Sequence, residues 1–252
     1  MANTPIRQLR NPPIVEAVLD VDCDLPPGFD IASLEEPARA RFQDRYPKSR
    51  KQLLQEFKIE TGADPLPKMS ARPAIQAYRF LQDDERQLVQ VRSQGFSLNR
   101  LAPYTTLDDY LPEIERAWGL YVNLVSPVQI RVIRLRYINR ILVPMTAGQI
   151  DLDEFFKIGP RVPDEEKLML SGFLEQQASI EKGTGYQVNL VLTAQSPAEQ
   201  KLPVILDITV ASTDVLEAAD WASMLPILQS LRSLKNRIFA NSLTSKCIEL
   251  FQ

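Results

Sequence analysis

The sequence predicts an α+β fold in which a mostly antiparallel sheet carries long helices on one face. Three observations lead to this prediction. Six segments have the alternating or β-branched patterns of strands, two long segments repeat apolar residues at helical spacing, and polar turns join several of the strands. Hairpins of this kind favour antiparallel pairing over a doubly wound parallel sheet.

The predicted strands are bounded by polar or proline-containing stretches. A polar QDDER turn separates the second strand from the third, and a polar loop containing Pro197 separates the fifth from the sixth. The six strands are predicted at 14–22, 74–81, 87–98, about 128–143, 186–193 and 204–211.

Two long helices are predicted at about 107–124 and 221–242, each with an apolar stripe. Thr106 and Asp109 resemble a capping box at the start of the first. A third helix is expected from Ser33 to about residue 46, and a shorter one over 165–177. The stretch 47–73 contains four prolines and is interpreted as an irregular, inserted or mobile loop.

In chain order these elements read β-α-β-β-α twice. Each long helix follows a hairpin and has a Leu-Pro pair near its start, where proline suits a first helical turn. We therefore predict two structurally repeated halves, 1–126 and 127–252, whose strands join in one sheet to make one continuous domain. The alternative is two loosely joined α+β domains.

The composition is that of a globular protein with no export or membrane segment. The 252 residues are 44% apolar and 24% charged, with a net charge of −3. Neither a signal peptide nor an apolar run of spanning length is evident, so we expect a cytoplasmic protein with no membrane partner. Cys23 and Cys247 are then expected to be reduced thiols, with a disulfide between them as the alternative.

The chain contains no histidine, which excludes several kinds of chemistry. Ser-His-Asp and Cys-His nucleophile systems and histidine-based metal sites are ruled out, and two cysteines cannot build an all-cysteine zinc site. No glycine-rich phosphate loop is present. No cofactor and no catalytic residue are predicted, although carboxylate-bound Mg²⁺ is still allowed.

The stretch VQIRVIRLRYINRILVP (128–144) carries four arginines on a strand that is otherwise apolar. Because side chains alternate along a strand, Arg134, Arg136 and Arg140 share one face, and Arg131 belongs near the strand start or a bulge. The same alternation on the other strands predicts one apolar face under the helices and one polar face. The polar positions assigned in this way are Glu16, Asp20, Asp22, Gln90, Arg92, Gln94, Gln187, Asn189, Asp207 and Thr209.

Three interpretations of this polar face are open. It is a solvated surface of cross-strand ion pairs, an anion-binding surface, or a buried network that specifies how the two halves join. The second would use arginine forks to hold a nucleotide or an RNA backbone. Its ligand-binding residues would be Arg92, Arg134, Arg136, Arg140, Gln90, Gln94 and Asn139.

Two enzyme families share features with the sequence. LDVDCD (19–24) invites comparison with the aspartate nucleophile of haloacid-dehalogenase-type phosphatases, but the predicted hairpins conflict with that fold. Carboxylates and arginines on one face suggest triphosphate-tunnel enzymes, whose Glu-x-Glu-x-Lys run is missing. A Mg²⁺-dependent phosphohydrolase using Glu16, Asp20 and Asp207 is kept as the weaker alternative.

Four stretches carry a resemblance to a known family. NPPIVEAV (11–18), FSLNRLAPYTT (96–106), RLRYINRILVP (134–144) and LKNRIFANSLT (234–244) resemble a sporadically distributed family of bacterial proteins of uncharacterised function. The resemblance implies a cytoplasmic protein, and the patchy distribution of the family suggests an association with toxin–antitoxin or phage-defence genes. It supplies no catalytic residue.

The expected function is that of a non-enzymatic interaction protein. It would be a partner of a neighbouring gene product, with a homodimer also considered and with one sheet or helix surface as the docking site. The alternatives are the anion-, nucleotide- or RNA-binding module and the phosphohydrolase.

Overall fold

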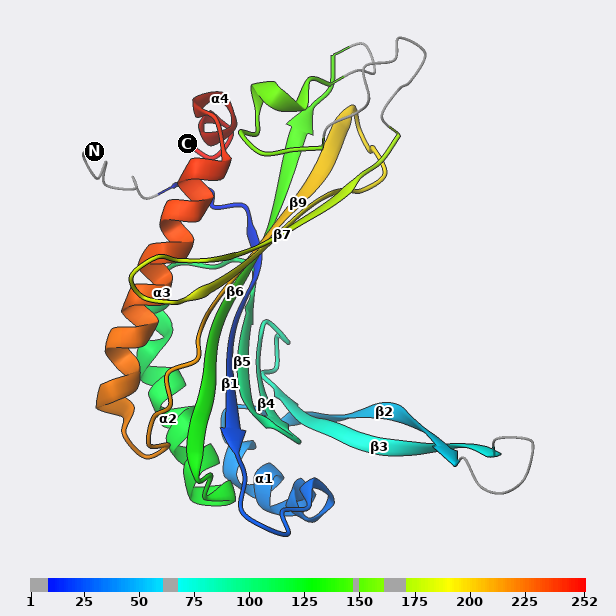
Figure 1. Ribbon diagram of the computed structural model, residues 1–252, viewed down its shortest axis with the longest axis vertical. Helices are drawn as coiled ribbons and strands as arrows, with labels where there is room; N and C mark the ends of the chain where they lie inside the picture. Colours follow the sequence, from blue (N-terminus) through cyan, green and yellow to red (C-terminus); the bar gives the residue numbers. More distant parts are fainter. Residues whose placement is uncertain (1–8, 61–67, 147–149, 161–170) are drawn as a thin grey trace.

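A computed structural model of the chain describes residues 9–60, 68–146, 150–160 and 171–252, with side chains described outside 55–72. It contains one nine-stranded sheet, with helices that come between its strands in the sequence and after the last of them (Figure 1). The fold class is therefore α+β, as the sequence predicts.

The strands carry the labels of Figure 1. They are β1 (Ile14–Asp24), β2 (Lys48–Glu60), β3 (Lys68–Leu81), β4 (Gln87–Arg92), β5 (Gly95–Leu101), β6 (Gln129–Pro144), β7 (Leu174–Ile180), β8 (Gln187–Ala194) and β9 (Lys201–Ser212). The helices are α1 (Glu35–Phe42), α2 (Leu107–Val125), α3 (Trp221–Ser242) and α4 (Ser245–Glu249), with short 3-10 turns at Ile31–Leu34 and Leu152–Glu154.

Every neighbouring pair of strands in the sheet is antiparallel, in the order β2-β3-β4-β5-β1-β6-β9-β8-β7. The two strands at its centre, β1 and β6, come from different halves of the sequence. β1 is flanked on its other side by β5, and β6 by β9, so each central strand pairs with the last strand before the next long helix. The halves thus share one sheet.

The hydrophobic core lies between this sheet and helices α2 and α3, which run side by side along one side of it (Figure 1). Trp118 of α2 packs edge-on against Phe96 of β5, with ring centroids 5.6 Å apart. α1 adds a smaller contact, in which Phe42 stacks on Phe80 of β3 at 5.4 Å. Burial of these large rings supplies much of the driving force for the fold.

The register confirms the alternation on which the sequence prediction depends. Leu19 of β1 lies opposite Leu98 of β5 and Leu135 of β6, and all three are buried. One residue further along β1, Asp20 lies opposite Ser97 and Arg134. Directly paired residues point to the same face, so the apolar and polar sets separate as predicted.

Several predicted boundaries are wrong. Much of 47–73, expected to be irregular, forms β2 and the start of β3, so the sheet gains an edge hairpin that extends away from the body (Figure 1). The segment 87–98, predicted as one strand, is the β4–β5 hairpin. Its turn depends on Gly95 (φ +151°), where a Cβ would lie 2.0 Å from the Val21 carbonyl oxygen.

Two helix predictions also need correction. The helix expected from Ser33 to about residue 46 is a 3-10 turn followed by the shorter α1. Of the helix expected at 165–177, residues 165–170 lie outside the described residues, and Leu174–Ile180 is strand β7. No described helix is long and apolar enough to cross a membrane.

The start of α2 forms half of the predicted capping box. The Thr106 side chain makes no capping hydrogen bond. Hydrogen bonds from the Thr105 side chain, and from Thr106, hold the pKa of Asp109 below its ordinary value. Cys23 and Cys247 are free, buried thiols, so the disulfide alternative is not formed.

Candidate functional site

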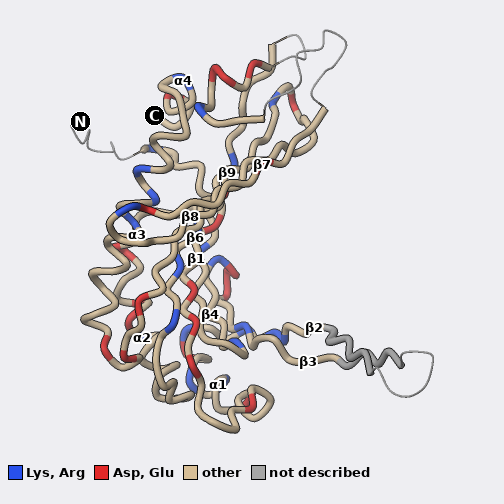
Figure 2. Tube along the Cα trace, viewed as in Figure 1, with Lys and Arg blue, Asp and Glu red and all other residues tan. Residues whose placement is uncertain are grey.

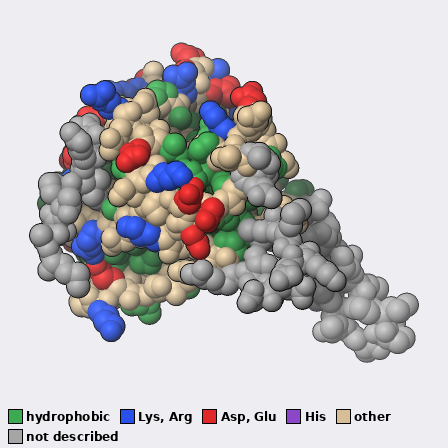
Figure 3. Space-filling view, turned by 90° about the horizontal axis from the view of Figure 1, so that it is seen from above, with side chains coloured by type: hydrophobic (Ala, Val, Ile, Leu, Met, Phe, Trp, Pro, Cys, Tyr) green, Lys and Arg blue, Asp and Glu red, His purple; other side chains and the backbone are tan. Residues whose placement is uncertain are grey.

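The face of the sheet opposite α2 and α3, here called the open face, carries the predicted polar residues. Figure 2 shows basic and acidic positions interspersed along the central strands. Figure 3, which views the molecule from above, shows side chains of both signs next to one another at that end. The charged and amide positions of the open face include Glu16, Asp20, Asp22, Arg79, Gln90, Arg92, Asn99, Arg134, Arg136, Arg140, Gln187, Asn189 and Asp207.

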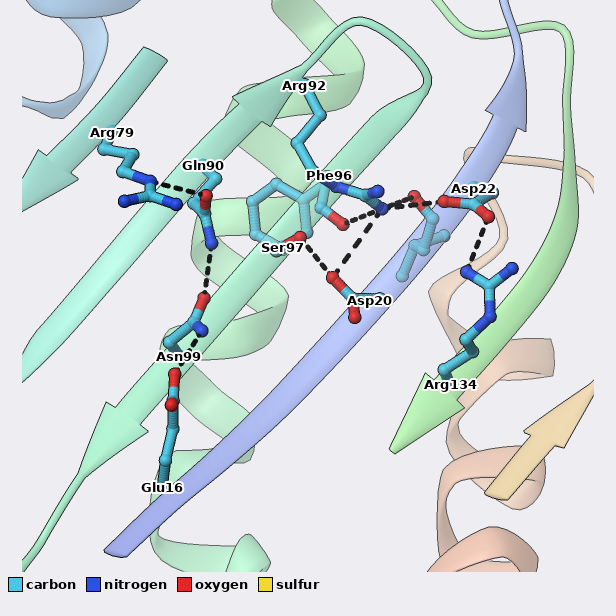
Figure 4. A network of polar contacts seen from close by, with 11 residues as sticks. Glu16, Asp20, Asp22, Arg79, Gln90, Arg92, Phe96, Ser97, Asn99 and Arg134 are labelled. Atoms are coloured by element: carbon cyan, nitrogen blue, oxygen red, sulfur yellow. Dashed lines mark hydrogen bonds and ion pairs between the residues drawn. The ribbon is translucent and has the colours of Figure 1, made fainter. Parts of the chain in front are cut away.

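A chain of hydrogen bonds crosses four strands on the β3 side of this face (Figure 4). Arg79 Nε donates to Gln90 Oε1 at 3.0 Å, and Gln90 Nε2 donates to Asn99 Oδ1 at 2.8 Å. Asn99 Nδ2 then donates to Glu16 Oε1 at 2.7 Å. Gln90 and Asn99 are buried, and each amide uses its oxygen and its nitrogen within the chain.

Asp22 is the centre of a second network, which ties the two halves together (Figure 4). Its Oδ1 accepts from Arg92 Nη2 at 2.8 Å and its Oδ2 from Arg134 Nη1 at 2.6 Å. Burial raises the pKa of this carboxyl, but the hydrogen bonds and charges of Arg134 and Arg92 outweigh burial and leave the pKa below its ordinary value. Asp22 is therefore a carboxylate shared by two guanidinium groups.

Arg92 is further held by the backbone, because its Nη2 also donates to the carbonyl oxygens of Val21 and Phe96 at 3.2 and 3.1 Å. Asp20 lies 3.8 Å from the same nitrogen and accepts a hydrogen bond from the Ser97 hydroxyl. All of these contacts are made by one nitrogen, Nη2, and Nε of Arg92 is buried without a hydrogen-bond partner among the described residues.

Two further arginines of β6 are paired with carboxylates. Arg136 makes a fork to Asp207 of β9, with Nε to both carboxylate oxygens at 3.0 and 2.9 Å, and this hydrogen bonding raises the pKa of Arg136. Arg131 Nε lies 2.9 Å from Asp24 Oδ1, close to the start of β6 and to a register shift in the β1–β6 ladder. The predicted position of Arg131 at a strand start or bulge is confirmed.

Arg140 differs from the other three arginines of β6. It is exposed, and within the described residues it has no carboxylate partner. Its Nε donates to the Gln195 side-chain oxygen at 3.3 Å. The open face therefore brings Arg92, Arg134 and Arg136 together with their counter-charges and leaves Arg140 apart.

Two of the predicted ligand residues do not belong to this face. Gln94 lies in the turn between β4 and β5, where its carbonyl oxygen accepts from Cys23 N at 2.9 Å. Asn139 lies opposite Leu206 on the helix-covered face and is buried, and its amide donates to the carbonyl oxygens of Leu206 and Tyr137. Asn139 has odd parity along β6, so it points away from Arg136 and Arg140.

The three carboxylates of the phosphohydrolase alternative are each engaged with a neighbour. Glu16 accepts from Asn99, Asp20 from Ser97 and Asp207 from Arg136. Across the part of the chain that the structure describes, no group of three His, Cys, Asp or Glu side chains is placed to hold a metal ion. The geometry thus gives that alternative no assembled site.

Beyond Asp207, towards the β7 edge, large apolar side chains are exposed on the open face. Ile180 is 70% exposed. It pairs with Gln187 of β8, Gln187 pairs with Ala211 of β9, and Ala211 pairs with Arg134 of β6, so Ile180 lies on the same face as Arg134. By the same ladder Leu174 (73% exposed) shares a face with Arg140. Leu142 of β6 is also exposed and shares the parity of Arg140.

A second polar site lies on the other side of β6, under α3. Asn139, predicted as a ligand residue of the open face, lines a cavity here, whereas Lys235 was not predicted. Lys235 is 9% exposed and sits over the Tyr137 ring, with Nζ 4.0 Å from the ring centroid. Its position was readable, because a lysine at 235 continues the apolar stripe formed by Leu228 and Leu231 of α3. Lysine is rarely buried unless its charge is paired, so a lysine on a buried stripe indicates that a partner is expected.

Comparison of the chain with protein-family models, with curated proteins and with solved structures finds no match. The resemblance to a sporadically distributed bacterial family therefore stays a prediction.

Proposed function

We propose that this protein is a non-enzymatic interaction protein whose open face binds a protein partner, the product of a neighbouring gene in an antitoxin-like or phage-defence setting. The observation that carries the proposal is the coexistence, on one face, of internally compensated ion pairs and exposed large apolar side chains. Leu142, Leu174 and Ile180 supply the apolar part. Isolated exposed apolar residues are ordinary, but three on one sheet face next to interspersed charges match the make-up of protein interfaces.

The pairing of the arginines supports a protein partner over a phosphate ligand. A phosphate binding at Arg92 or Arg134 would lie beside the Asp22 carboxylate, and at Arg136 it would compete with Asp207 for the same donors. In each case a carboxylate lies close to the incoming anion, which is repulsive. A protein surface carries charges of both signs and can complement such a face without breaking its pairs.

The β7 edge offers a second means of contact. β7 ends the sheet, so one side of its backbone has no strand partner within the described residues. Edge strands of this kind pair readily with an added strand. We expect the partner to contact Leu174 and Ile180 through an extended segment that adds to β7.

The architecture and the cellular location are also part of the proposed function. We propose that the β1-to-α2 and β6-to-α3 halves are a duplicated unit with the long helices on one face, supported by the equivalent places of β1 and β6 in the strand order. We also propose a cytoplasmic location, where the free thiols Cys23 and Cys247 would stay reduced.

The experiment is co-expression with the product of each adjacent gene, followed by purification and light scattering of the complex. The test variant is Leu174→Lys with Ile180→Lys, and the control is Val215→Lys, an equally exposed apolar side chain in the β9–α3 connection. We expect a stable complex that the double variant loses and the control keeps. A complex insensitive to the double variant, or a homodimer formed through β7 with no heterologous complex, would overturn the proposal.

A further inference from the structure

A cavity of about 500 Å³ lies on the helix side of the sheet, away from the open face. It is lined by four parts of the chain, namely the segment before β1, the start of α2, the middle of β6 and the middle of α3, and it is open to the surface. Its size falls in the range of small-molecule sites, roughly 300–1,000 Å³. Leu9, Pro13, Ile14 and Phe239 give it an apolar wall.

Lys235 of α3 forms the charged part of this cavity. Although its side chain is more than nine-tenths buried, it makes no hydrogen bond or ion pair with any described residue, and its contact is the Tyr137 ring. Desolvation by burial, and then the neighbouring charge of Arg232, lower the pKa of Lys235 to about 8. An ammonium group in this position is stabilised by the ring but lacks an anion.

The other charged and polar groups at the cavity do not supply that anion. Asp108, the carboxylate that lines it, is bound by Arg232 at 2.7 Å, and this bond lowers the pKa of Asp108. The hydroxyls of Tyr104 and Tyr137 bond to each other at 3.1 Å, and burial raises both of their pKa values. Among the described residues that line the cavity, Arg10, Arg232 and Lys235 against Asp108 therefore leave two positive charges in excess.

The start of α2 also borders the cavity. Thr105, Thr106 and Leu107 line it, and the Thr106 hydroxyl does not cap the helix. The first turn of this helix carries Asp108 and Asp109, and these carboxylates offset the positive end of the helix dipole.

We infer that this cavity is a binding site for a small organic anion, a carboxylate or phosphate monoester with an apolar body. The anionic group would lie against the Lys235 ammonium, and the body would pack on Ile14 and Phe239. The site is separate from the open face, and the inference does not depend on the proposed function. A net charge of two positive units suits one such group.

The test measures binding of benzoate and of phenyl phosphate to the full chain by titration calorimetry, with benzyl alcohol as the uncharged comparison. We expect binding of at least one anion at millimolar concentration and much weaker binding of the alcohol. The tighter of the two anions identifies the head group. Failure of both anions to bind, or equal binding of the alcohol, would overturn the inference.

Lys235→Met is the decisive variant and Lys246→Met is its matched control. Lys246 also sits over an aromatic ring, that of Phe155, but it is exposed and paired with Glu154. We expect the first variant to weaken anion binding about ten- to hundredfold, as for loss of a charged hydrogen bond, and the second to leave it unchanged. Equal affinity of the Lys235→Met variant and the unaltered protein would contradict the inference.

A measurement on the unaltered protein guards against a folding defect in the variant. Arg10, Arg232, Asp108, Tyr104 and Tyr137 also line the cavity. The Arg232 hydrogen bond lowers the pKa of Asp108, and burial raises the pKa of Tyr104 and of Tyr137, so these three groups keep their charge state near pH 8. Among these facing groups Lys235 is the one that titrates near pH 8. Anion affinity should therefore fall as pH rises through 8, and a flat profile between neutral pH and pH 9.5 would count against Lys235 as the anion's partner.

Discussion

Positively charged side chains on the two faces of β6 differ in whether a carboxylate neutralises them. On the open face, Arg134 shares Asp22 with Arg92, and Arg136 is forked to Asp207. On the helix face, Lys235 rests on Tyr137 with no carboxylate at hydrogen-bonding distance among the described residues. A cation whose counter-charge lies in the same chain contributes to architecture, whereas a buried cation without one indicates a ligand from outside.

The largest effect on stability is expected at Asp22, the carboxylate shared by two arginines of the open face. Asp22→Asn removes the charge that holds two guanidinium groups of different strands, and we expect it to lower the free energy of unfolding by about 3 kcal/mol. Urea denaturation followed by circular dichroism measures this. Ser49→Ala, at an exposed position of β2, serves as a control with little expected effect. A loss below about 0.5 kcal/mol would show that the network is a solvated surface.

Lys235→Met should change the free energy of unfolding in the opposite direction to Asp22→Asn. It removes a buried ammonium, and we expect it to raise the unfolding free energy near pH 7 by about 1–3 kcal/mol, since one pKa unit corresponds to about 1.4 kcal/mol. The folded-state pKa of about 8 lies below the unfolded value, so the unfolded chain binds more protons between them. The unaltered protein therefore gains stability as pH rises from about 8 to about 10.5, and the advantage of the variant shrinks over that window.

Thermal denaturation at pH 7 and pH 10 tests this sign. A Lys235→Met variant that is less stable than the unaltered protein at pH 7 would mean that the lysine already has a stabilising partner inside the chain.

The stability of the protein at low pH should depend on Asp22. The pKa of Asp22 is lowered in the folded state, so its contribution is present above the unfolded value of about 4 and is lost as pH falls through the folded value. We expect the unaltered protein to lose stability more steeply below pH 4 than Asp22→Asn does. Parallel curves of unfolding free energy against pH would remove Asp22 from the account of acid stability.

The smallest effect is expected at Arg131, on the same strand as Arg134. Arg131 and Asp24 are both about half exposed, so Arg131→Ala should change the unfolding free energy by about 0.5 kcal/mol or less. Arg134→Ala, measured alongside it, should cost more because it leaves Asp22 with one partner. Equal losses for the two variants would show that burial does not distinguish these arginines.

Part of the fold could be read from local patterns. The alternation in 128–144 placed Arg134, Arg136 and Arg140 on one face, and the register of β6 confirms it. The apolar stripes of α2 and α3 were equally readable. The pattern of 47–73 was not, because its four prolines suggested a loop, yet Pro73 lies in β3, where it pairs with Gln55 of edge strand β2.

The candidate sites show the same division. The face of each side chain follows from the pleat of its own strand, a property of neighbouring residues, so local alternation was enough to predict that arginines and carboxylates share one surface. The packing of distant elements was needed to show that Asp22 neutralises Arg92 and Arg134, and that Lys235 contacts the Tyr137 ring and, among the described residues, no carboxylate. Those pairings join residues some 70 to more than 100 positions apart, and their energy depends on which elements pack together and how much water they exclude.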